Sequence, residues 1–572
     1  MKKHGILVLL VVSLFGCQNS TKKKDSALVT STMMCAPVTN DRSWYESDRT
    51  APLFDGLGDL QFPASTKDTL AQKYINQGLI LAYGFNHAEA ARSFYYATQL
   101  DPNCAIAFWG YAYVLGPNYN SGMESDHYER AYKAIQTALK LSKDRATEKE
   151  KALIEALSHR YVKDPVEDRT PLDQAYAKAM KVVYSKYPND VDVGCLYAES
   201  LMNLHPWDLQ DKNGNDKKWT PEIIALLEKC ITLNPKHPGA HHFYIHAVEA
   251  SHTPERGLKS AALFDTGLVP NAGHLVHMPS HIYIRTGDYH QGTLANIQAL
   301  KVDSVYVTAC HAQGAYPLAY YPHNQHFMAA TATLEGNSKW ALYAANELQK
   351  KSNRQLMKEP GWGTIQHYYT IPYYVYVKFG KWDEVLAFTN EVPELDYPTA
   401  ILHYAKGLSY LGKGNLTAAK MELKALEKIA SKETLKEITI WEINSAFDLV
   451  QIAQKVLKAE LLWHEKKYTQ SLTLFNEAVA IEDALNYNEP PDWFFSVRHH
   501  LGAKQLEAKH YPDAVRTYTQ DLKKYPKNGW ALKGLSVAYL KLGDLSKQKE
   551  AALQFDAAWK TADIPLNSSI IQ

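Results

Sequence analysis

The stretch "YGFNHAEAARSFYYATQLDPNCAIAFWGYAYVLG" (residues 83–116) has a counterpart in "AKHYPDAVRTYTQDLKKYPKNGWALKGLSVAYLKLG" (residues 508–543). Each begins with an aromatic residue or a histidine near a turn, continues with small and apolar residues at helical spacing, and contains a proline midway. Apolar residues spaced by three and four positions predict an amphipathic helix, and a proline interrupts one. Both stretches therefore predict a pair of helices joined by a short turn.

The same pattern recurs along most of the chain. Aligning the turns predicts hairpins that begin near the following residues: Ala71, Ala105, Val191, Pro238, Gly273, Pro322, Gln366, Ala400, Phe495 and Gly529. Several of these starts are 34 residues apart, as from 71 to 105, 366 to 400 and 495 to 529. A fixed period of this length indicates an array of stacked structural repeats.

Each copy resembles the tetratricopeptide repeat, and the resemblance covers most of residues 68–562. It implies an all-α fold, an α-solenoid that winds into a right-handed superhelix of helical hairpins. In such an array each hairpin buries its apolar face only against its neighbours. Small residues recur where two helices would approach closely: Gly78, Ala90, Gly407, Ala419, Gly502 and Ala514.

The repeats divide the chain into three groups of hairpins. Residues 51–230 form an N-terminal group with a polar loop inserted at 206–222, residues 231–395 a central histidine-rich group, and residues 396–572 a C-terminal group. A second insertion is predicted at 304–321, because the spacing from Gly273 to Pro322 exceeds one repeat.

Several blocks also resemble a narrower family of bacterial tetratricopeptide-repeat proteins. The blocks are "LYAESLMNLHPWDL", "HHFYIHAVEAS", "GHLVHMPSHIYIRTGDY" and "YYPHNQHF". This family has no settled activity. The resemblance therefore implies a fold and leaves the function open.

Histidines are concentrated in the central group. Nine of the 23 lie between His237 and His290. In tetratricopeptide arrays the first helix of each hairpin lines a concave groove, and its second, fifth, ninth and twelfth residues point inward. When these inward positions are carried over to this chain, and Arg285 one helical turn further is added, the resemblance implies a set of side chains in the groove. They are Glu199, His242, His246, Glu249, His274, His277, His281, Arg285, His323, His326 and His367.

A metal site is one interpretation of this cluster. Side chains three and four positions apart lie on one face of a helix, so His242, His246 and Glu249 offer three ligands from a single helix. With His277 and His281 they form the candidate metal site, for zinc or copper, because imidazole and carboxylate groups are the usual ligands. Glu249 or Glu199 could then serve as a ligand or a general base.

Two other interpretations need no metal. The histidines could line a groove that binds a polar or aromatic ligand, or they could form a structural network with some of the 37 tyrosines. Pro279 lies inside the run from His274 to His281, and proline fits best in the first turn of a helix. If the helix begins at Pro279, His274 and His277 lie in the preceding loop.

The N-terminus, "MKKHGILVLLVVSLFGCQNS" (residues 1–20), indicates export. Its apolar run, from Gly5 to Gly16, is too short to span a bilayer and follows two lysines, as in a signal peptide. The tetrapeptide ending at Cys17 resembles the lipobox of bacterial lipoproteins, which implies removal of residues 1–16, lipidation of Cys17 and a tether over 17–50. Gln18 favours the outer membrane, although the face is left open. The alternative is an ordinary secretory signal with a chance cysteine.

The charge and composition of the chain exclude some functions. A net charge of +1 gives no positive electrostatic field that would attract nucleic acid, so nucleic-acid binding is set aside. Five scattered cysteines remain after Cys17, an odd number, so at least one is free or pairs between chains. The chain has no GxSxG, P-loop, GxGxxG or HExxH motif, and no catalytic residue is assigned.

These observations favour a binding protein over an enzyme. We predict a lipid-anchored cell-envelope scaffold that holds a peptide, protein or glycan partner in its groove, accessory to a polysaccharide-utilisation or envelope-assembly system. That association is an analogy with other lipoproteins of similar build. The alternative is a metal-binding protein or metallohydrolase with its site in the groove.

Overall fold

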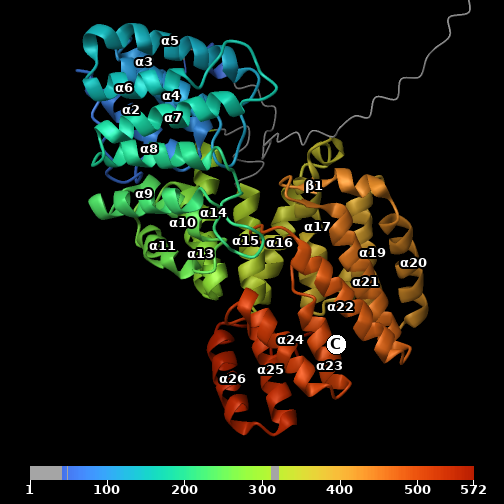
Figure 1. The fold of residues 1–572 in the computed structure, drawn as a ribbon. Coiled ribbons are helices and arrows are strands. Elements are labelled where there is room, and N and C mark those ends of the chain that lie inside the picture. Colours follow the sequence, from blue (N-terminus) through green and yellow to red (C-terminus); the bar gives the residue numbers. More distant parts are fainter. Residues whose placement is uncertain (1–41, 48, 311–320, 572) are drawn as a thin grey trace, which may run out of the picture. The chain divides into compact units, whose positions relative to one another are not determined.

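The structure is a computed structural model that describes residues 42–47, 49–310 and 321–571 (Figure 1). Almost all of its regular structure is helical. The α-helices of the first half are α1 (Arg42–Tyr45), α2 (Thr69–Tyr83), α3 (His87–Leu100), α4 (Ala105–Leu115), α5 (His127–Arg145), α6 (Glu148–Ser158), α7 (Thr170–Lys186), α8 (Val191–Met202), α9 (Thr220–Leu233), α10 (Pro238–Val248), α11 (Leu258–Asp265), α12 (Gly273–His277), α13 (Pro279–Thr286) and α14 (Tyr289–Cys310).

The second half continues in the same way. Its α-helices are α15 (Tyr321–Leu334), α16 (Ser338–Lys351), α17 (Gly363–Lys378), α18 (Trp382–Ala387), α19 (Asp396–Gly412), α20 (Leu416–Ala430), α21 (Ala446–His464), α22 (Tyr468–Ala484), α23 (Arg498–Glu507), α24 (Tyr511–Lys524), α25 (Gly529–Leu542) and α26 (Leu545–Ala558). Short 3-10 helices occur at Pro254–Gly257, Leu356–Lys358 and Glu433–Glu437. Strands β1 (Thr439–Ile440) and β2 (Asn444–Ser445) pair antiparallel, with Thr439 opposite Ser445.

The predicted hairpin starts are confirmed. Helices α4, α8, α10, α12 and α25 begin at the predicted residues, and α2, α15, α17, α19 and α23 begin within four residues of them. Local signals set these starts. Asp68, Asp190 and Asn528 each accept a hydrogen bond from a backbone N–H in the first turn of the following helix, as N-cap residues do. The chain is thus an all-α stack of tetratricopeptide-like helical hairpins.

Glycines allow the helices of a hairpin to pack closely. Gly78 on α2 lies against the ring of Phe94 on α3, so that a Cβ added to Gly78 would lie 2.7 Å from that ring. Gly502 on α23 lies against Tyr518 on α24 in the same manner, whereas Gly407 on α19 lies against Leu457 on α21, a helix of the next hairpin. The predicted role of Gly78, Gly407 and Gly502 is confirmed.

Substituting Gly78 is therefore expected to destabilise the first hairpin. Phe94 is fully buried and cannot move aside, so Gly78→Ala should lower the free energy of unfolding by about 1–3 kcal/mol despite the better helix propensity of alanine. Urea denaturation followed by circular dichroism measures the change. Met421→Ala, on an exposed position of α20, is the control and should change it by less than about 0.5 kcal/mol. An unchanged midpoint for Gly78→Ala would contradict the close packing.

The predicted insertions have different outcomes. A loop does lie between α8 and α9, but the predicted end of the 206–222 loop is too late, because α9 begins at Thr220 with Pro221 in its first turn. The insertion predicted from residue 304 is wrong at its start, because α14 continues to Cys310. No glycine or proline interrupts the chain between 304 and 310. Residues 311–320 lie outside the described residues.

The expectation that hairpins contact only their neighbours is wrong. The indole of Trp530 on α25 donates a hydrogen bond to the carbonyl of Thr333 on α15, and Tyr289 donates to the carbonyl of Pro526. Near the other end, His242 on α10 bonds the carbonyl of Tyr83 on α2. Contacts between distant hairpins thus add to those between neighbours, and they depend on side chains that no repeat pattern marks.

The apolar core is divided into two large clusters. One runs from Ala51 to Tyr283 and the other from Ile284 to Leu566. The central histidines lie where these clusters meet: Phe85 of the first packs on His242, and Phe327 of the second packs on His277. A polar cluster thus lies between the two apolar clusters.

None of the described helices is long and apolar enough to cross a bilayer. The predicted signal peptide and Cys17 lie outside the described residues. Cys104, Cys195 and Cys230 are buried with free thiols.

Candidate metal centre

Three consecutive hairpins supply the candidate ligands. Helix α10 carries His242 and His246, and Glu249 is the first residue after it. His274 and His277 lie on α12, His281 on α13 and His323 on α15. The candidate ligands are not all close in the sequence, since α15 begins 40 residues after His281.

Pro279 bends the chain without placing His274 and His277 in a loop. Met278, between α12 and α13, keeps helical dihedrals (φ −52°, ψ −32°), and Pro279 takes the first position of α13, where its missing N–H costs least. The expected helical spacing therefore holds through the bend. His277 and His281 lie on one face.

The side chains of this cluster are buried. His242, His246, Glu249, His274, His277 and His281 each expose 3% or less of their surface. The open groove expected at these positions is therefore closed. Aromatic rings cover the histidines: Phe85 and Trp207 pack on His246, while Phe327 packs on His277, His281 and His323.

Oxygen acceptors hold four of the imidazoles through Nδ1. His246 Nδ1 lies 2.8 Å from Glu249 Oε1, and His281 Nδ1 lies 2.5 Å from Glu249 Oε2. His242 Nδ1 lies 2.5 Å from the carbonyl oxygen of Tyr83, and His277 Nδ1 lies 2.7 Å from Asn296 Oδ1. Since a carboxylate or carbonyl oxygen only accepts, we assign the proton of each neutral ring to Nδ1. Each Nε2 then presents a lone pair.

These lone pairs face one another. His277 Nε2 and His281 Nε2 are 3.0 Å apart, and in the assigned neutral tautomers neither nitrogen carries a proton to share. His246 Nε2 is buried without a hydrogen-bond partner. Two imidazole ligands on one tetrahedral zinc ion, at about 2.0–2.1 Å each, have nitrogens about 3.3 Å apart. The spacing of His277 and His281 is therefore close to that of two ligands of one ion.

The ligand atoms form two groups of three histidines, and a third group, of His246, Glu249 and His281, overlaps both. His242, His246 and His274 have nitrogens within 4.8 Å of one another, and so do His277, His281 and His323. We call these the first and second triads. Glu249 joins them, because its two oxygens bond His246 of the first triad and His281 of the second.

The protonation states suit metal binding. Burial lowers the pKa of His242, His274 and His277 well below the usual value, and the neighbouring histidines lower it further. Burial alone would raise the pKa of Glu249, but His281 and His246 outweigh it, and that pKa is lowered. These three imidazoles are thus neutral and the carboxylate ionised, as ligands and their supporting groups must be.

Glu199 is separated from this cluster. Its carboxylate bonds the side-chain amide of Asn203 and interacts with Arg160, and burial raises its pKa to about 7. Glu199 belongs to neither triad. The expectation that it lies among the histidines is therefore wrong, because α8 directs it towards Arg160 on a different hairpin.

Arg285, His326 and His367 lie beside the centre. Arg285 Nε donates to the carbonyl of Glu249 at 3.0 Å, which positions the backbone of that residue. His326 and His367 form a separate pair with ring centroids 5.3 Å apart, and His367 Nδ1 lies 2.7 Å from the Tyr397 hydroxyl. Neither histidine belongs to a triad.

Sequence reasoning missed the groups that orient the imidazoles. The Tyr83 carbonyl lies 159 positions before His242, and Asn296 lies on α14, the helix that follows the histidine run. A backbone carbonyl leaves no residue-type signal. Asn296 follows Gly292 by four positions and bonds its carbonyl, which is also unmarked in the sequence.

Comparisons with known proteins add little. No protein family and no curated protein matches the sequence. Among solved structures, the human IFIT1 dimer with m7Gppp-AAAA is 15% identical, with 89% of this chain and 92% of that chain covered and a TM-score of 0.31. The APC/C hetero-tetramer Cut9-Hcn1 is 12% identical over 86% and 74%, with a TM-score of 0.28. Naa15/Naa10 bound to HypK-THB is 13% identical over 87% and 71%, with a TM-score of 0.22. Similarity of this extent supports no statement about what this chain binds.

Proposed function

We propose that this chain is a metalloprotein that holds two transition-metal ions, one in each histidine triad. The observation that carries the proposal is the facing pair of His277 and His281, whose Nε2 atoms are 3.0 Å apart while both Nδ1 atoms are engaged elsewhere. A structural histidine network would place a proton between such nitrogens. A cation satisfies both lone pairs.

The donor set favours copper or zinc. All six candidate ligands are imidazoles, which suit zinc, copper, iron and nickel, whereas magnesium, calcium and manganese prefer oxygen. Glu249 supports the ligands: a carboxylate bonded to Nδ1 fixes the tautomer of a histidine and makes Nε2 a better donor. One carboxylate shared by His246 and His281 would support both ions.

Each triad supplies three protein ligands, one fewer than a tetrahedral zinc ion takes. Three protein ligands with an open position are typical of catalytic sites, in which a metal activates water or polarises a substrate, whereas structural zinc usually has four protein ligands. We therefore infer a reactive centre within the helical stack, in which the hairpins serve as the scaffold.

Elemental analysis tests the proposal. Protein produced without a polyhistidine tag should contain about two equivalents of copper or zinc per chain, lost on dialysis against a strong chelator and regained on reloading, as two three-ligand sites require. Protein that is free of metal and takes up none would contradict it.

The envelope location predicted from the sequence is a further proposal. It is supported by the apolar run and the lipobox-like tetrapeptide before Cys17. A peptide, protein or glycan partner held by the hairpins, in a polysaccharide-utilisation or envelope-assembly system, is a second candidate function. It is supported by the repeat architecture, since stacked repeats commonly form binding surfaces.

Loss of Cys17 is expected to release the protein from membranes. Cys17→Ser cannot carry the acyl chains that give stable anchoring, so the variant should lose all incorporation of radiolabelled palmitate and move from the membrane to the soluble fraction. Cys35→Ser is the matched control and should keep both properties. Equal labelling of the Cys17→Ser variant and the unaltered protein would refute the anchor.

A further inference from the structure

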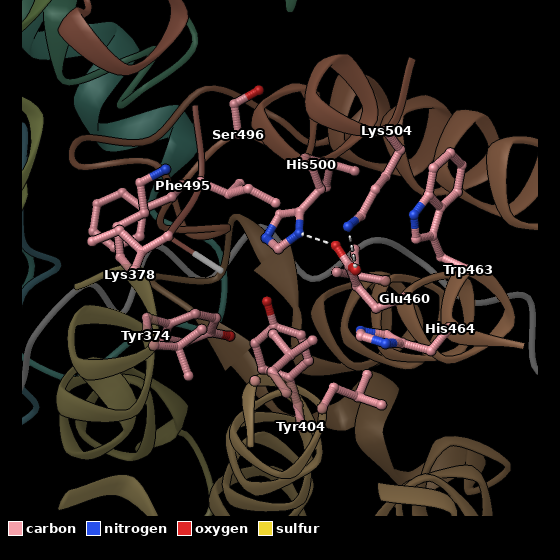
Figure 2. A pocket seen from close by; sticks show the side chains of 18 of the residues that line it. Tyr374, Lys378, Tyr404, Glu460, Trp463, His464, Phe495, Ser496, His500 and Lys504 are labelled. Carbon is pink, nitrogen blue, oxygen red and sulfur yellow. Dashed lines mark hydrogen bonds and ion pairs between the residues drawn. The ribbon is translucent and has the colours of Figure 1, made fainter. Parts of the chain in front are cut away.

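A cavity lies apart from the triads, among α17, α19, α21 and α23 (Figure 2). Its volume is about 430 Å³, and it shares no residue with either triad. We call it the aromatic pocket, after the rings that line it: Tyr374, Tyr404, Trp463, Trp493 and Phe495. Its volume lies in the range of small-molecule sites.

The rings of the pocket hold one another in place. Trp493 packs edge to face against Tyr374, with centroids 5.4 Å apart, and against Tyr404 at 5.6 Å. Rings fixed in this way present faces and edges on which a flat ring can pack. The walls therefore favour an aromatic ligand.

The buried charged groups of the pocket already have partners, whereas Lys466, which also lines it, is exposed. Glu460 bonds His500 Nδ1 at 2.7 Å and pairs with Lys504 at 3.2 Å, and Lys504 also pairs with Glu507. Burial raises the pKa of Glu460, but Lys504 and His500 outweigh it and lower that pKa to about 2. The amine of Lys378 bonds His499 Nδ1 and the carbonyl of Ser569, neither of which lines the pocket.

The neutral ring of His500 offers a hydrogen-bond acceptor inside the pocket, while His464, which also lines it, is exposed. His500 donates from Nδ1 to the Glu460 carboxylate, so its Nε2 carries a lone pair, and no described residue bonds that nitrogen. Figure 2 shows that this nitrogen points away from Glu460 and that the Tyr404 hydroxyl points towards the His500 ring. The pocket thus offers the acceptor of His500 and the hydroxyls of Tyr374 and Tyr404 within aromatic walls.

These groups select among ligand classes. An anion would face the lone pair of His500 and the ionised Glu460. A sugar would bury several hydroxyls against rings that cannot bond them, at a cost for each. A phenol has one flat ring and one O–H donor, which matches the walls and the acceptor of His500.

We propose that the aromatic pocket binds a neutral phenolic molecule of one or two rings, whose hydroxyl donates to His500 Nε2. The site is independent of the metal centre and of the function proposed for it.

Calorimetric titration of metal-free protein with three matched probes tests this. p-Cresol should bind saturably with one site, and toluene, which lacks the hydroxyl, should bind about three- to tenfold more weakly, the worth of one hydrogen bond. p-Toluate, which carries a negative charge, should be weaker than either. Absence of saturable p-cresol binding, or tighter binding of p-toluate than of p-cresol, would overturn the proposal on the unaltered protein alone.

Two substitutions locate the binding. Leu408→Trp fills the cavity from α19 and should abolish binding of p-cresol and toluene alike. His500→Phe removes the acceptor but keeps a ring, so p-cresol should then bind no better than toluene. His403→Phe is the control, because His403 also bonds a carboxylate, that of Glu422, but lies outside the pocket. Unaltered p-cresol binding in Leu408→Trp, or an unchanged preference for p-cresol in His500→Phe, would place the ligand elsewhere.

Discussion

The double variant His277→Ala/His281→Ala is expected to bind about one metal equivalent where the unaltered protein binds about two, because one imidazole cannot hold an ion in a site built from three. His242→Ala/His246→Ala should likewise lose one equivalent, from the first triad. The quadruple variant should bind none. Elemental analysis after dialysis against a weak chelator, with circular dichroism to confirm folding, gives the stoichiometry of each.

Two other buried histidines provide the matched control. His326 and His367 are as buried as the ligands but belong to neither triad. Their double substitution by alanine should leave both equivalents in place. If either triad variant loses both ions together, the two triads do not bind independently. If both triad variants keep two equivalents, the histidines are not the ligands.

Glu249→Gln is expected to weaken metal binding by about 10- to 100-fold, the usual effect of losing a group that orients a ligand. Glutamine has the shape of glutamate, but only its oxygen can accept. One of the two Nδ1–H groups, from His246 or His281, would therefore meet an N–H donor. That ring must change its tautomer or turn, and it then directs a proton towards the ion.

Competition with a coloured chelator measures the affinities. Glu199→Gln is the matched control, since Glu199 is equally buried but lies with Arg160 and Asn203. It should leave the metal affinity unchanged. Equal affinities for Glu249→Gln and the unaltered protein would show that Glu249 does not support the ligands.

Much of the fold follows from local sequence signals. The starts of the hairpins were predictable because N-caps, prolines and apolar spacing act within one turn of helix, as at Asp190 before α8 and Pro238 in α10. The pairing of His277 with His281 was predictable for the same reason, since four residues make about one helical turn.

The rest depends on contacts between distant segments. Nothing near His242 in the sequence indicates that the Tyr83 carbonyl holds it, or that Phe85 covers it. The groove was therefore expected to be open, whereas the rings of other hairpins close it. Glu199 has the expected position on its helix, but its side chain is directed towards Arg160. The repeat pattern does not reveal this interaction.

Anomalous X-ray diffraction from crystals of the metal-loaded protein, recorded on both sides of the copper and zinc absorption edges, tests the central claim most directly. We expect two anomalous peaks of the same element. One should lie within coordinating distance of His242, His246 and His274, and the other within that distance of His277, His281 and His323. Crystals soaked in either metal that show no peak among these histidines, with the rings in the same arrangement, would contradict it.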